Sequence, residues 1–235
     1  MQRINYVRDA TSRMLAGLDW LTDADMARSS LCPGWTAGHV LTHIARNADA
    51  LRRSVDGARR GELVPLYDSQ QARAADIEAG AARPIAELAA DIGKSALLLD
   101  DAWSALDSAA WEREMLHWRG RLPAHDSPSM RWGEVEIHRV DLACGYGPAD
   151  WPAPYVAHLL DQAAETVAAR LPPGVAVELR ATDTPARWSL GSGDGQITVS
   201  GPSWAIAAWM VGRLAAGAGV LSVGGGELPE LGPWR

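Results

Sequence analysis

Residues 36–51 have the sequence TAGHVLTHIARNADAL, and this stretch decides the predicted architecture. Thr36 is a typical helix N-cap residue, because its hydroxyl can accept a hydrogen bond from the first turn. Apolar side chains then recur every three or four residues from Val40 to Leu51. The pattern predicts a long amphipathic helix that continues to about residue 60, before Gly61, and buries one face against other helices.

Similar patterns extend outward from this helix. Further helices are predicted over residues 4–22, 70–79, 84–106 and 127–145, with an irregular stretch at 111–126. Three prolines within 147–154 indicate a domain boundary, and the chain then predicts a helix at 155–170, strands at 175–180, 186–190 and 196–200, and a helix at 203–214. We therefore expect a mainly α protein, with a four-helix bundle over residues 1–147 and a small α/β domain over 148–235.

Composition excludes several classes of protein. The chain has 235 residues and a formal net charge of −7 without a basic block, so phosphate-mediated binding of nucleic acid is not expected. No apolar run is long enough for a membrane span, and the N-terminus does not resemble a signal peptide. Two cysteines are too few for a disulfide scaffold, so we expect a cytoplasmic protein. The oligomeric state is left open, and a monomer is compatible with the sequence.

Polar side chains at helical spacing form the sharpest chemical feature. Glu134 and His138 are four residues apart and share one helix face, where they can bind one metal ion, and Asp141 can orient the imidazole. His43 lies on the central helix, with His39 and Asn47 four residues to either side. Facing helices would bring two imidazoles and one carboxylate together and leave a position open for a ligand. The alternative is that these side chains form ordinary solvated helix stripes.

The remaining candidates are weaker. Cys32 and Cys144 have no histidine at an obvious local spacing, so we expect structural or incidental thiols and no protein nucleophile. His117, His125 and His158 are expected to be ordinary surface or core histidines. Arg213 is expected to end the last predicted helix, where it either complements the helix dipole or binds an anion with its planar guanidinium.

Two segments resemble the signatures of the mycothiol-dependent maleylpyruvate isomerase family. The first is Pro-Gly-Trp-Thr at 33–36 with the histidines that follow it, and the second is Met-Arg-Trp-Gly-Glu-Val-Glu-Ile-His-Arg-Val-Asp-Leu at 130–142. Gly-Arg at 212–213 and Gly-Glu-Leu-Pro-Glu at 226–230 also match the family. The resemblance spans essentially the whole chain, and the two helix signatures occur in looser form across the wider DinB-like metal-binding superfamily.

The resemblance implies a DinB-like four-helix bundle with a small C-terminal α/β domain and a set of site residues. It implies a divalent metal ion, usually zinc, on the residues matching His43, Glu134 and His138, and an arginine needed for activity at Arg213. Three further matching positions are candidates for binding the substrate or the thiol; they are His39, Asn47 and Arg131.

The resemblance also implies the activity. Members of the family isomerise maleylpyruvate to fumarylpyruvate in gentisate catabolism, with mycothiol as the thiol cofactor that adds to the C=C bond and leaves again. The substrate is a small anion, so a chain of net negative charge must supply local cations. The alternative is a mycothiol S-transferase that conjugates an electrophile in detoxification or biosynthesis. A third interpretation is a non-enzymatic metal-binding module, which the retained ligand types and Arg213 disfavour.

Overall fold

The computed structural model describes residues 2–117, 120–193, 195–215 and 218–232, and these divide into two compact units. The first unit ends at Gly145 and the second begins at Tyr146, close to the boundary predicted after residue 147. Within the described residues, no helix is both long enough and apolar enough to cross a membrane.

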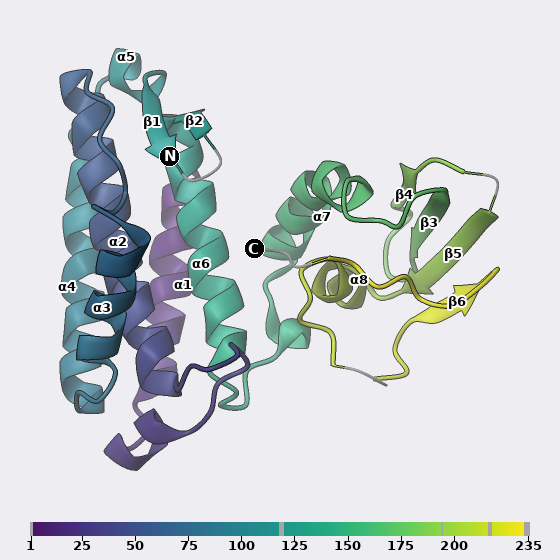
Figure 1. Cartoon of the computed structure of the whole chain (residues 1–235), viewed down its shortest axis with the longest axis horizontal. Coiled ribbons are helices and arrows are strands. Elements are labelled where there is room, and N and C mark those ends of the chain that lie inside the picture. Colours follow the sequence, from purple (N-terminus) through teal and green to yellow (C-terminus); the bar gives the residue numbers. More distant parts are fainter. Residues whose placement is uncertain (1, 118–119, 194, 216–217, 233–235) are drawn as a thin grey trace. The chain divides into compact units, whose positions relative to one another are not determined.

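The first unit is a four-helix bundle (Figure 1). Its helix α2 packs against α4 and α6, and α1 packs against the same two helices, while α3 lies against α2. The helices of this unit are α1 (Gln2–Leu18), α2 (Ala37–Arg60), α3 (Gln70–Gly80), α4 (Ile85–Ser104), α5 (Ser108–Trp111) and α6 (Ser127–Asp141), with short 3₁₀ turns at Asp23–Ala27 and Ala124–Asp126. The predicted bundle is confirmed.

Helix α2 is central because its sequence fixes both ends and buries a broad face. The Thr36 hydroxyl accepts a hydrogen bond from the His39 backbone N–H, which caps the N-terminus. Gly61 adopts a left-handed conformation with φ of 76° and ends the helix. Val40, Leu41 and Ile44 are fully buried on the face toward the other helices. This packing holds His43 inside the bundle.

Helix α6 is the second helix of the site. Pro128 lies in its first turn, where the missing N–H costs nothing, and Trp132, Val135 and Val140 are buried. The helix ends at Asp141, about four residues earlier than predicted. The backbone N–H of Leu31 donates to the Asp141 carbonyl at 2.8 Å, which ties the loop before α2 to the end of α6.

The stretch predicted to be irregular contains regular structure. Residues 114–117 (β1, Glu114–His117) and 120–123 (β2, Gly120–Pro123) form an antiparallel hairpin, with α5 before it. Four-residue strands are too short to show a clear period of two, and Gly120, which begins β2, has φ of 108°, a conformation that favours glycine. The prediction for this stretch was therefore wrong in detail, although the bundle is unaffected.

The second unit is the expected small α/β fold (Figure 1). Its sheet has the order β4-β3-β5-β6; β3 and β5 are parallel and the outer pairs are antiparallel. Helices α7 and α8 pack against each other and against the sheet. The elements are a 3₁₀ turn at Pro148–Asp150, α7 (Ala153–Ala168), β3 (Val175–Ala181), β4 (Arg187–Gly191), β5 (Gly195–Gly201), α8 (Ser203–Met210) and β6 (Ser222–Gly224).

Helix α8 ends earlier than predicted, so Arg213 is not its last residue. Gly212 has φ of 70° and its N–H bonds to the Trp209 carbonyl, while the Arg213 N–H bonds to the Ala208 carbonyl. These two bonds form a Schellman motif, in which the glycine takes the left-handed position just after the helix. Arg213 therefore lies two residues beyond the helix C-cap, and the prediction that it ends the helix was wrong.

Candidate metal centre

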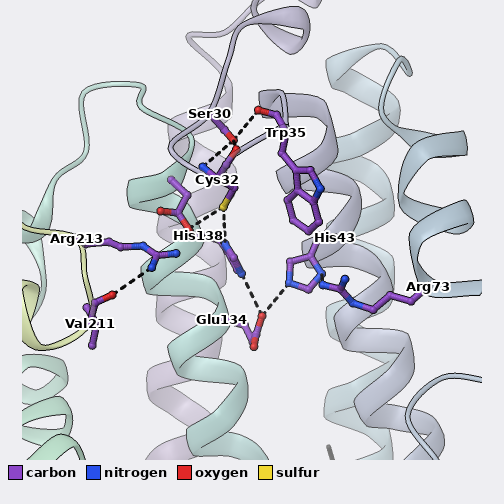
Figure 2. A network of polar contacts seen from close by, with 10 residues as sticks. Ser30, Cys32, Trp35, His43, Arg73, Glu134, His138, Val211 and Arg213 are labelled. Atoms are coloured by element: carbon purple, nitrogen blue, oxygen red, sulfur yellow. Dashed lines mark hydrogen bonds and ion pairs between the residues drawn. The ribbon is translucent and has the colours of Figure 1, made fainter. Parts of the chain in front are cut away.

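The structure brings His43, Glu134 and His138 together (Figure 2). His43 comes from α2, and the other two come from consecutive turns of α6. The Glu134 Oε2 atom lies 3.0 Å from His43 Nε2 and 3.3 Å from His138 Nε2. One nitrogen or oxygen atom from each residue lies within 4.8 Å of the others. The two polar stripes therefore converge within the bundle, which excludes the alternative of solvated stripes for these three residues.

Asp141 orients His138. Its Oδ2 atom lies 2.9 Å from His138 Nδ1, and the carboxylate is fully buried. A carboxylate can only accept, so Nδ1 carries the hydrogen, and Nε2, on the side that faces Glu134, is the ring nitrogen that could bind a metal ion once it has lost its own proton. The Cys32 thiol also donates to Asp141 Oδ2, at 3.3 Å. This arrangement is the one expected for a metal-binding histidine supported by a buried carboxylate.

The protonation behaviour of the three residues reflects burial and mutual contact. Burial lowers the pKa of His43 to about 4, since the charged imidazolium loses hydration. Burial disfavours the charged form of His138, but its hydrogen bonds to Asp141, Cys32 and Glu134 outweigh this and raise the pKa well above its usual range. Burial also opposes ionisation of Glu134, yet the two histidines hold the pKa of this carboxyl well below its usual range. Glu134 is therefore a carboxylate at neutral pH, which is the form that binds metal.

The donor set fits a divalent ion. Two imidazole nitrogens and one carboxylate oxygen are ligands that zinc and several other divalent metals accept, and three protein ligands leave a coordination position for a further group. A second group with metal-ligand atoms consists of Cys32, His138 and Asp141. In that group the Cys32 thiol and His138 Nδ1 already share Asp141 Oδ2 as their acceptor. The set of His43, Glu134 and His138 is therefore the better candidate for the metal ligands, because it leaves a coordination position for a further group.

An arginine that the sequence did not indicate lies beside His43. The Arg73 Nη2 atom, from α3, is 3.2 Å from His43 Nδ1. The Arg73 guanidinium lies 5.6 Å from the ring centres of both Trp35 and Tyr67, a distance at which a cation is attracted by an aromatic face. Figure 2 shows Arg73 approaching His43 from the side opposite Glu134, with the Trp35 ring over the imidazole.

The three weaker candidates occupy different environments. The His39 ring contacts Thr36 and Glu78, with Nε2 3.0 Å from the Glu78 carboxylate, so it takes part in capping α2. Asn47 accepts a hydrogen bond from Arg131 Nη1 at 2.8 Å, and the same Nη1 donates to a backbone carbonyl. Arg131 is fully buried, and burial lowers the pKa of its guanidinium to about 10. Its Nε and Nη2 atoms have no hydrogen-bond partner in the described part of the chain.

Other predicted residues are outside the set of three clustered ligands. Arg213 belongs to the second unit, where its Nη1 donates to the Val211 carbonyl at 3.1 Å. Cys144 is a free thiol that donates to the Leu142 carbonyl. None of the remaining histidines belongs to a group of three potential metal ligands among the described residues; they are His117, His125 and His158.

Sequence patterns gave no signal for four residues at or beside the cluster, which are Cys32, Trp35, Tyr67 and Arg73. Both Cys32 and Trp35 lie in the turn before α2, and Trp35 belongs to the first signature, but no pattern in that turn shows its contact with α6. Tyr67 precedes the polar helix α3, and Arg73 lies within it; neither belongs to a recognisable motif. Their positions depend on how α3 packs against α2, and local periodicity does not encode that packing.

Comparisons with known proteins identify a family and solved structures that this chain is similar to. Residues 7–143 match the family model of the mycothiol maleylpyruvate isomerase N-terminal domain, and residues 150–233 match the model of the MDMPI C-terminal domain. Among solved structures, the chain is similar to the mycothiol-dependent maleylpyruvate isomerase, with 30% identity and a TM-score of 0.87 over 99% of this chain and 96% of that one. A histidine-to-alanine mutant of that name matches with 29% identity and the same TM-score and coverage. Comparison with curated proteins finds no significant match.

Proposed function

This chain belongs to the mycothiol-dependent maleylpyruvate isomerase family, and we propose on that premise that it converts maleylpyruvate to fumarylpyruvate with mycothiol as a recycled cofactor. The observation that carries the proposal is the cluster of His43, Glu134 and His138, with Asp141 behind His138. Similarity over both units supports the isomerase more strongly than the S-transferase.

The proposed reaction changes geometry without net change in composition. A thiolate adds to one alkene carbon of the substrate, which forms a C–S bond and moves the π electrons onto the conjugated carbonyl oxygen. The remaining single bond rotates. The electrons then return, the C–S bond breaks, and the trans product leaves with the thiolate regenerated. No convincing protein nucleophile is needed, in agreement with the environments of Cys32 and Cys144.

The protein's own residues prepare the site for this chemistry. His43, Glu134 and His138 would hold a divalent ion, of which zinc is our proposal, and a bound ion would supply a lowered thiol pKa. Asp141 keeps the hydrogen of His138 on Nδ1, so that Nε2 remains a donor of its lone pair. His43 and Asp141 are buried, and the Glu134 and His138 side chains are only 17% and 16% exposed. From the second unit, we propose that Arg213 supplies a cation for the anionic substrate, as the family resemblance implies.

The test is a spectrophotometric assay of the zinc-loaded protein with maleylpyruvate. Conversion to fumarylpyruvate is expected with a trace of mycothiol and is not expected without it, because the thiol is regenerated in each cycle. A metal-replete protein that shows no conversion would overturn the proposal. Consumption of one mycothiol per electrophile would instead establish the S-transferase, in which the C–S bond is retained.

The ligand assignment has its own test. The variants His43→Ala and His138→Ala are each expected to lose most of the bound metal and all thiol-dependent turnover, whereas His125→Ala should retain both. His125 is the control because it lies 3.4 Å from Glu112, outside the cluster. Elemental analysis that found full metal content in either cluster variant would contradict the assignment.

A further inference from the structure

Arg73 differs from the arginines around it because no carboxylate pairs with it among the described residues. Arg53, which precedes it, pairs with Asp68 at 2.7 Å, and Arg83, which follows it, pairs with Asp91 at 2.8 Å. The half-buried Arg73 side chain contacts an imidazole nitrogen, two aromatic rings and the Tyr67 hydroxyl. A guanidinium held in this way keeps its charge and most of its N–H donors available for an anion.

The second observation is an asymmetry between the two histidines of the cluster. His138 Nδ1 donates to the buried Asp141 carboxylate, whereas His43 Nδ1 faces the Arg73 guanidinium. Arg73 has only donors, so in the protein without metal His43 Nδ1 accepts and its Nε2 hydrogen goes to Glu134. Metal-binding histidines almost always donate the other N–H to an oxygen, but on the Nδ1 side of His43 the structure shows this guanidinium.

Metal binding would change the hydrogen-bond partners that His43 Nδ1 and Arg73 require. If the Nε2 lone pair of His43 is used for a metal ion, the hydrogen must lie on Nδ1 and faces the N–H groups of Arg73. Two donors 3.2 Å apart then face each other, and an acceptor oxygen that lies beside both would satisfy them. A carboxylate is the suitable group, because it carries the opposite charge and can accept from both donors at once.

We infer that Arg73, together with His43 Nδ1–H, binds a carboxylate of the substrate. The ligand thus supplies for His43 the oxygen that Asp141 supplies for His138, and Arg73 is a substrate-binding residue within the first unit. Trp35 and Tyr67 keep the guanidinium in position through contact with its faces. The inference rests on the proposed function, since it places one end of the dicarboxylate substrate beside the metal cluster.

The experiment measures binding of maleate, a cis-dicarboxylate, by calorimetry in the absence of any thiol, so that no reaction occurs. Zinc-loaded wild-type protein is compared with Arg73→Gln, Arg73→Lys and Arg60→Gln, and the zinc content of each is measured. Arg60 is the control because it ends α2, 17 residues from His43, which is about 25 Å along the helix, and pairs with Glu62.

We expect Arg73→Gln to raise the Kd for maleate about tenfold or more at unchanged zinc content, as for the loss of a charge-assisted hydrogen bond. Arg73→Lys should recover part of the affinity, because the charge remains and the fork is lost. Arg60→Gln should stay within about twofold of the wild type. An unchanged Kd in Arg73→Gln, or a loss of affinity matched by loss of zinc, would overturn the inference.

The outcome is separable from that of the proposed function. Arg73-dependent maleate binding in a protein that does not isomerise maleylpyruvate would leave the carboxylate site standing and remove the isomerase. Normal isomerisation with a wild-type KM in Arg73→Gln would leave the isomerase standing and remove the carboxylate site.

Discussion

At the scale of single residues, Asp141 is a buried carboxylate that orients a proposed metal ligand, His138, without being one of the three ligands itself. It fixes the hydrogen of His138 on Nδ1 and also accepts from the Cys32 thiol. The carboxylate is fully buried, so water does not compete for its oxygens. The effect of its charge on metal binding should therefore be separable from the effect of its volume on packing.

The variant Asp141→Asn tests this effect. The amide keeps the volume but loses the charge, so the orientation and basicity of His138 are weakened, and we expect metal affinity to fall about 10- to 100-fold. Glu136→Gln is the matched control, since Glu136 is a buried carboxylate on the same helix that pairs with Arg13. Zinc competition titrations check the result. Equal affinity in Asp141→Asn and the wild type would show that Asp141 acts only on stability.

Arg213 can be tested without disturbing the helix before it. The bond that ends α8 uses the backbone N–H of residue 213, which alanine keeps. We expect Arg213→Ala to lower kcat/KM by about 100-fold or more while metal content and melting temperature stay close to the wild type. Steady-state kinetics and a thermal melt are the measurements. Wild-type kinetics would remove the proposed role of Arg213 in binding the anionic substrate.

At the scale of elements, α3 determines where Arg73 lies, and Gly80 determines how closely α3 approaches α2. A Cβ atom at Gly80 would overlap the Thr42 side chain, so this close approach requires glycine. Thr42 is buried, and its hydroxyl has no partner within the described residues. A change at this contact should therefore move α3 without removing a hydrogen bond.

The variant Gly80→Ala is expected to displace α3 and, with it, Arg73. The Kd for maleate should rise several-fold and stability should fall by about 1–3 kcal/mol, as in other overpacked contacts, although alanine is the better helix former. Zinc content should not change, because α3 carries none of the three proposed ligands. Calorimetry measures both ligands, and the double variant Gly80→Ala/Thr42→Ala, which frees space, should restore maleate binding. Unchanged maleate affinity in Gly80→Ala would show that maleate binding does not depend on how α3 packs against α2.

The elements also show what the sequence could and could not predict. The bounds of α2 and α4 were predicted to within one or two residues, whereas α1 and α6 each end about four residues earlier than predicted. The hairpin β1–β2 was not, because four-residue strands carry too little pattern. The end of α8 was placed too late because its apolar residues continue to Val211, whereas the left-handed Gly212 decides the end.

The site follows the same division. Spacing on one helix indicated Glu134, His138 and Asp141, and spacing on another indicated a stripe with His39 and His43, from which the family resemblance selected His43. Arg73 and Tyr67 could not be found, because only tertiary packing brings them to His43. The role of His39 in binding the substrate or the thiol stays a prediction; in the structure its ring contacts Thr36 and Glu78.

At the scale of the whole molecule, all three proposed metal ligands come from the first unit, on helices α2 and α6. The second unit has its own buried core, in which Val177, Leu179 and Val199 from the sheet and Ile206 from α8 are almost fully excluded from solvent. A metal ion bound by these three ligands would therefore link α2 to α6, both of which belong to the first unit. Stabilisation by metal should accordingly differ between the units.

Hydrogen exchange of the full-length protein, with and without zinc, tests this difference. An ion that binds only the folded state at 100 times its Kd stabilises it by about 2.7 kcal/mol, so amides that exchange through unfolding of the first unit should slow about 100-fold. Protection should be largest in α2 and α6 and absent from β3 and β5. His138→Ala, which lacks a ligand, should show no zinc effect anywhere. Equal protection of both units by zinc would mean that they unfold together, and the stabilising effect of the cluster would then extend to the whole chain.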